Sequence, residues 1–127
     1  MQDKGNKFSL KQRLKSFVYA YNGLKHFWKK EHNFQIHLLA ALLSIGLGYY
    51  LKIAITEWVI LVLLIGMVMA AEIFNSAIEH LSDLVMPEQN PQIGKVKDIA
   101  AAAVLILAIA ALIIGLIIFL PKILLLL

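Results

Sequence analysis

Residues 99–120 read IAAAAVLILAIAALIIGLIIFL, an apolar stretch without a single charged side chain. A helix of about 20 apolar residues crosses the roughly 30 Å hydrocarbon core of a bilayer, so we predict a transmembrane helix over residues 98–120, stopped by Pro121. The whole chain has the same character, because 61% of its 127 residues are hydrophobic, 16% are charged and the mean hydropathy is +0.79. A soluble domain this small cannot bury so much apolar surface. We therefore predict an all-α integral membrane protein, with residues 1–127 forming a single membrane domain.

Two further spans are predicted before this helix. Residues 36–55 form the first, with Lys52 near its end, where a long side chain reaches the membrane surface. The second begins at Trp58 with WVILVLLIGMVMAA, which is too short to cross alone, so we expect it to continue through AEIFNSAIEHLSD to residue 82. This continuation places Glu72 and Glu79 in or near the membrane. Residues 84–97 contain two prolines and a glycine and are predicted to form a loop.

The basic residues predict how the chain is oriented. Residues 1–30 contain eight of the twelve lysines and arginines, and apolar residues recur there at helical spacing, which predicts an amphipathic surface helix over about residues 8–31. In a three-span chain, this segment and the loop with Lys95 and Lys97 lie on one side, whereas Lys52 and Lys122 lie on the other. By the positive-inside rule, we expect the N-terminus and the loop to face the cytoplasm and the C-terminus to be external.

Polar side chains recur on one helical face of the second span. They are Glu72, Asn75, Ser76, Glu79 and Asp83, at positions i, i+3, i+4, i+7 and i+11. Carboxylates inside a membrane are costly and usually functional. The alternative is that these residues pair with a neighbouring helix and only hold the bundle together.

The chemistry of these residues narrows the functions that they could serve. The chain has no cysteine, and two carboxylates with an amide are hard oxygen ligands that suit Mg²⁺ rather than zinc. Lys97 and Asp98, at the start of the third span, and Glu31, just before the first, are expected to reach the same depth. For these three residues, an interfacial ion pair or a solvated charge at a helix end is the alternative.

Phosphoryl transfer is a reaction that such a set could perform. It requires metal ions and a cation on the phosphates, together with a base for the acceptor hydroxyl. Glu31 and Glu79 could hold the metal, Lys97 the phosphates, and Glu72, the deepest acid, the hydroxyl of an acceptor in the bilayer. The chain has no GxxxxGK[ST] loop and no kinase glycine loop, so its nucleotide site would differ from those of soluble kinases.

Two further interpretations concern the carboxylates and the histidines in or near the spans. A small non-enzymatic bundle, ion-conducting or scaffolding, could contain buried carboxylates of structural importance only. His37 and His80 each lack a second histidine at ligand spacing. We interpret both as hydrogen-bonded interfacial side chains and leave them out of the predicted catalytic set.

Three strings in the sequence resemble a known family. They are GLKHFWKKEHNF (residues 23–34), EIFNSAIEHLSD (residues 72–83) and KDIAAAAV (residues 97–104). Together they closely resemble the prokaryotic diacylglycerol kinase family, which includes the undecaprenol kinases. The resemblance extends over about residues 14–121.

The resemblance implies a homotrimer of three-span subunits with surface helices, in the bacterial plasma membrane, and active sites formed between subunits at the cytoplasmic face. It implies ATP-dependent phosphorylation of a membrane lipid alcohol, diacylglycerol or undecaprenol, with Mg²⁺. Glu72 would be the general base, and Glu31 and Glu79 would bind the metal. The implied nucleotide contacts are Gln12, Tyr19, Glu31, Asn75, Glu79, Glu88, Gln89, Asn90, Lys97 and Asp98.

Two positions bear on the lipid acceptor. Gln35 stands where the family often has an arginine, so a cationic contact near the site is missing. His37 resembles the undecaprenol kinase branch, whereas relatives that prefer diacylglycerol tend to have an acid there. The resemblance therefore favours a polyprenol acceptor modestly and leaves diacylglycerol open.

Overall fold

The computed structural model of the chain describes residues 7–127, so Lys4 of the basic segment lies outside the described range. Four helices follow one another: α1 (Leu10–Lys30), α2 (His32–Leu51), α3 (Ile55–Val85) and α4 (Pro91–Leu124). Within the described range, the residues up to Glu31 form one unit and residues 32–127 form a second. In the first unit, the hydroxyl of Ser9 accepts a hydrogen bond from the backbone N–H of Gln12 and caps α1.

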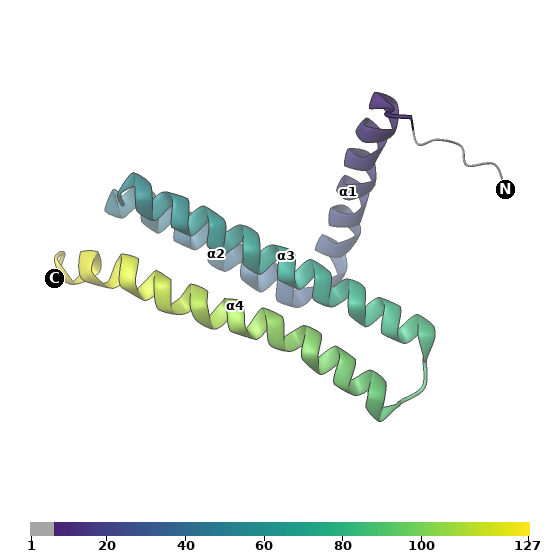
Figure 1. Ribbon diagram of the computed structural model, residues 1–127. Coiled ribbons are helices and arrows are strands. Elements are labelled where there is room, and N and C mark those ends of the chain that lie inside the picture. Colours follow the sequence, from purple (N-terminus) through teal and green to yellow (C-terminus); the bar gives the residue numbers. More distant parts are fainter. Residues whose placement is uncertain (1–6) are drawn as a thin grey trace. The chain divides into compact units, whose positions relative to one another are not determined.

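The second unit consists of three helices that lie side by side along most of their lengths (Figure 1). All three are long and apolar enough to cross a membrane, which agrees with the prediction of an all-helical chain with three spans. At about 1.5 Å per residue, α2 is roughly 30 Å long, whereas α3 and α4 are roughly 46 and 51 Å long. Since the hydrocarbon core is only about 30 Å thick, α3 and α4 extend well beyond it.

The connection between α3 and α4 is shorter than the sequence predicted. Most of the expected loop over residues 84–97 is helical, because α4 already begins at Pro91 and only residues 86–90 separate the two helices. The side chain of Asn90 accepts a hydrogen bond from the N–H of Gln92 at 2.8 Å. Proline in the first turn of a helix needs no hydrogen-bond partner for its nitrogen. The cap and the proline together extend α4 towards its N-terminus.

At its other end, α4 continues past Pro121 to Leu124, although we expected Pro121 to stop it. Proline costs most in the middle of a helix, and here it lies in the last turns. Lys122 forms an ion pair with Glu57 of α3, with 2.6 Å between Nζ and Oε1. The second carboxylate oxygen of Glu57 accepts the backbone N–H of Ala54 at 2.7 Å. Glu57 thus caps α3 and holds the end of α4 beside it.

The same end of the bundle, which we call the turn end, contains a cluster of buried apolar side chains. It consists of Ile53, Leu61, Ile118 and Phe119, all buried. Lys52, in the turn between α2 and α3, has a left-handed φ of 52°. The turn brings Trp58 of α3 onto α2, where its ring lies 4.9 Å from the ring of Tyr49.

Gly48 allows this close approach of the two helices. A Cβ atom at Gly48 would lie 2.9 Å from Cη2 of Trp58 and 3.1 Å from Cδ1 of Ile53, whereas a Cβ atom at Gly46 would meet nothing within 4 Å. We expect Gly48→Ala to destabilise the protein by about 1–3 kcal/mol through overpacking. Gly46→Ala should be neutral or slightly stabilising, because alanine is the better helix former. Unfolding midpoints in detergent micelles test this, and equal midpoints for the two variants would contradict it.

Candidate active site

A buried carboxylate in the middle of α3 lies against a histidine of α2. Glu72 is 4% exposed, and its Oε1 atom lies 2.9 Å from Nε2 of His37. The chain reverses between α2 and α3, and α3 is the longer helix, so a residue early in α2 faces one in the middle of α3. The sequence by itself does not predict a catalytic role for His37, because no sequence motif includes it. The depth of His37 in the membrane could have indicated the contact. Two consecutive spans run in opposite directions, so residues at the same depth, such as His37 and Glu72, lie side by side.

The next turns of α3 carry Asn75, Ser76 and Glu79. Ser76 is buried like Glu72, and Glu79 is half-buried. The Oδ1 atom of Asn75 is buried and, among the described residues, has no hydrogen-bond partner. A buried acceptor without a partner is costly and is uncommon in folded proteins. Its position one turn from Glu72 and one turn from Glu79 therefore suits contact with a bound donor or cation.

Lys97 of α4 pairs with Asp83 near the end of α3, with 2.5 Å between Nζ and Oδ1. The side chain of Lys97 is 34% exposed and that of Asp83 is 62% exposed. Exposed ion pairs contribute only about 0–1 kcal/mol, so Lys97 can exchange this partner for another anion at little cost. The sequence alone places Asp83 on the polar face of α3 and gives it no specific role. Asp98, the next residue of α4, is exposed.

The loop residues that were predicted to contact a nucleotide line one hollow. Glu88, Gln89, Asn90 and Lys97 surround a cavity of about 530 Å³ between the end of α3 and the start of α4. Asn90 also caps α4 through its side-chain oxygen. The structure therefore brings the loop residues and Lys97 together around one cavity, and their contact with a nucleotide stays a prediction.

Three other predicted residues belong to the first unit. Gln12 and Tyr19 are exposed on α1, and Glu31 follows the last residue of that helix. The backbone N–H of Glu31 donates to the carbonyl of Phe27 and so ends α1. The participation of these three residues in the site stays a prediction.

The acidic residues do not form a complete metal site by themselves. Within residues 7–127, no three histidine, aspartate or glutamate side chains lie close enough together to hold a metal ion. Mg²⁺, however, keeps several waters and is commonly held by one or two carboxylates plus substrate phosphates. A carboxylate at Glu79 and the unpartnered Oδ1 atom of Asn75 are oxygen donors of the kind that this ion accepts.

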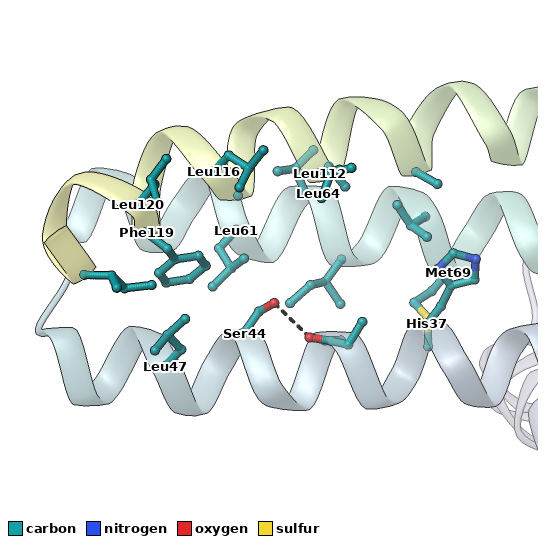
Figure 2. A pocket seen from close by; sticks show the side chains of 18 residues that line it. His37, Ser44, Leu47, Leu61, Leu64, Met69, Leu112, Leu116, Phe119 and Leu120 are labelled. Atoms are coloured by element: carbon teal, nitrogen blue, oxygen red, sulfur yellow. Dashed lines mark hydrogen bonds between the residues drawn. The ribbon is translucent and has the colours of Figure 1, made fainter.

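An apolar groove of about 500 Å³ runs along α2, α3 and α4 (Figure 2). His37 and Met69 lie at one end of it, and Leu47, Phe119 and Leu120 lie at the other. Its lining is otherwise aliphatic or small, and the hydroxyl of Ser44 is bonded to the carbonyl of Ala40 at 2.8 Å. From residue 37 to residue 47, the groove extends about 15 Å along α2. Its shape and lining suit a hydrocarbon chain, and its single titratable lining residue marks one end.

Comparison with known proteins identifies relatives over nearly the whole chain. The family model of the prokaryotic diacylglycerol kinases matches residues 18–119. Undecaprenol kinase of Bacillus subtilis (strain 168) is 41% identical over 122 residues, which are 96% of this chain and 99% of that protein. Diacylglycerol kinase of Escherichia coli (strain K12) is 35% identical over 100 residues, covering 79% of this chain and 82% of that protein. Diacylglycerol kinase of Helicobacter pylori (strain ATCC 700392 / 26695) is 36% identical over 96 residues, 76% of this chain and 75% of that protein.

Proposed function

The chain belongs to the prokaryotic diacylglycerol kinase family, and we propose that it transfers the γ-phosphate of ATP to a membrane polyprenol of the undecaprenol type, giving the lipid phosphate and ADP. Its relatives are lipid kinases, which decides against the non-enzymatic bundle. The observation that carries the proposal is the buried Glu72, paired with His37 at the end of an apolar groove. This arrangement joins a base to a site for a hydrocarbon chain.

The groove supports a lipid acceptor whose hydroxyl lies near Glu72. A hydrocarbon chain of the lipid in the groove would be surrounded by aliphatic side chains from three helices. Each CH₂ group buried from water contributes about 0.8 kcal/mol to the free energy of binding. The polyprenol is favoured over diacylglycerol because undecaprenol kinase of Bacillus subtilis is 41% identical and the diacylglycerol kinase of Escherichia coli 35% identical. In this proposal, the carboxylate of Glu72 supplies the basicity that removes the hydroxyl proton.

The hollow beside the loop supports a nucleotide site. Lys97 would exchange Asp83 for phosphate oxygens, and Glu88, Gln89 and Asn90 would contact the rest of the nucleotide. We propose that Gln12, Tyr19 and Glu31 approach the nucleotide from α1 and that Asp98 completes its contacts. An ammonium group holds phosphate as a point charge, so Lys97 orients the γ-phosphate for attack.

Mg²⁺ would be held by Glu31 and Glu79, with Asn75 nearby, and by the phosphates themselves. When bound, the ion would offset negative charge on the phosphates as the γ-phosphoryl group is transferred. The side chains of the protein hold the reactants in line and exclude water from the lipid hydroxyl. The hard oxygen donors on α3 fit this ion, and the nucleotide would supply the ligands that the described side chains lack.

We propose that the protein works as a homotrimer in the bacterial plasma membrane, with active sites shared between subunits. The N-terminus and the loop would lie in the cytoplasm, where the nucleotide is found, and α1 would lie along the membrane surface with its lysines towards lipid headgroups. The three spans of the described residues have little surface with which to enclose two substrates, which supports a site completed by a neighbouring subunit.

Initial rates with two lipids test the proposed function. Purified full-length protein in mixed micelles, with saturating Mg-ATP labelled at the γ-position, should phosphorylate undecaprenol at a higher kcat/KM than diacylglycerol. A preference for diacylglycerol would correct the acceptor while keeping the kinase. No labelled product with either lipid would refute the proposed function as a whole.

A further inference from the structure

The histidine that contacts Glu72 is more accessible from the groove than Glu72 itself. The side chain of His37 is 25% exposed, whereas that of Glu72 is 6% exposed. His37 is part of the groove lining and Glu72 is not. Figure 2 shows the imidazole at one end of the groove, the end at which Met69 also lies. A hydroxyl at the end of a hydrocarbon chain in the groove would therefore meet the imidazole first.

The contact between the two side chains assigns different roles to the two ring nitrogens. Nε2 lies 2.9 Å from the carboxylate of Glu72. Of the two neutral tautomers of the imidazole, this contact selects the one with its hydrogen on Nε2, because the carboxylate can only accept a hydrogen bond. In that tautomer, Nδ1 carries a lone pair and can accept a proton. A carboxylate behind an imidazole fixes the tautomer and stabilises the imidazolium that forms when a substrate proton is taken up.

Among the described residues that line the groove, His37 is the titratable one. The lining residues from α3 and α4 are all apolar, and among the lining residues from α2 only Ser44 is also polar. The hydroxyl of Ser44 already donates to the carbonyl of Ala40. From the helix that faces it, α3, the charged group that contacts His37 is Glu72.

We propose that His37 and Glu72 act as a dyad, in which the imidazole takes the proton of the lipid hydroxyl and the carboxylate orients and stabilises the imidazole. The proposal rests on the proposed function and refines the part of Glu72 in it. The lipid oxygen forms a bond to the γ-phosphorus while the bond from that phosphorus to the β,γ-bridging oxygen breaks. The bridging electron pair leaves with ADP, and the hydroxyl proton moves to Nδ1 and later to water.

Two substitutions at His37 test the dyad in the full-length protein. His37→Gln keeps a side chain that can donate to Glu72 but cannot act as a base, so kcat should fall about 10²- to 10⁴-fold with an unchanged KM for ATP. His37→Ala leaves space at the end of the groove. Imidazole added to the assay should restore part of its kcat, and the restored rate should rise with the concentration of neutral imidazole.

His26→Ala is the matched control, because His26 is exposed on α1 and belongs to no part of the proposed site. It should keep the wild-type rate and show no response to imidazole. A His37→Gln variant with the wild-type kcat, or a His37→Ala variant that imidazole does not activate, would overturn the dyad. The wild-type chain separates the two claims, since absence of its product refutes the proposed function, whereas wild-type turnover with an unchanged His37→Gln variant refutes the dyad alone.

Discussion

Replacing Glu72 with glutamine is expected to lower kcat about 10²- to 10⁴-fold, the range for loss of a general base. The amide cannot take up or stabilise a proton at the lipid hydroxyl. It also presents either a neutral oxygen or an N–H group to Nε2 of His37, so the tautomer of the imidazole is no longer determined. Binding of Mg-ATP should remain nearly intact, because the base acts on the acceptor.

The measurement is kcat with undecaprenol together with the dissociation constant for a nonhydrolysable ATP analogue. Glu57→Gln is a suitable control, because Glu57 is also a glutamate of α3 with a cationic partner, Lys122, but lies at the turn end. Its variant should keep the kinase rate. Glu72 is 4% exposed and removing a charge from a buried site within a membrane lowers a desolvation cost, so Glu72→Gln should fold. A near-normal rate for this variant would mean that Glu72 neither takes up the hydroxyl proton nor stabilises the imidazole that does.

Replacing Glu79 with glutamine is expected to raise the Mg²⁺ concentration for half-maximal activity on the order of tenfold, since Mg²⁺ depends on one or two carboxylates when phosphates supply its other ligands. Glu79 is half-buried two turns from Glu72 on α3, and glutamine has nearly the same shape. The substitution therefore removes the negative charge and leaves the packing unchanged. The affinity for Mg²⁺ should fall, and excess Mg²⁺ should restore much of the rate.

The dependence of the initial rate on free Mg²⁺ at constant ATP checks this expectation. The same titration of Glu57→Gln should overlay that of the wild type. A curve for Glu79→Gln that also overlays the wild type would remove Glu79 from the metal ligands. This result would leave the role of Glu72 untouched, because the two variants report on different steps.

Local patterns in the sequence predicted the helices well. The apolar runs identify three helices that are long enough to cross a membrane, because hydrogen bonds within a span are satisfied locally and need no other part of the chain. The same reasoning predicted that α3 continues beyond its apolar part, because the apolar stretch that begins at Trp58 is too short to cross a membrane by itself. The start of α4 was misplaced, although Asn90 and Pro91 form a cap signal that is readable in the sequence.

The sequence alone therefore determined the membrane class, the family resemblance and the helical face that contains Glu72, Asn75 and Glu79. All three depend on composition or on spacing within one helix. Only the tertiary structure decided which side chain each of these polar groups meets. The pairing of His37 with Glu72 and of Lys97 with Asp83 joins different helices, and their contact depends on the axial register and rotation of packed helices. Those are set by side-chain packing along the whole bundle, which no single stretch of sequence encodes.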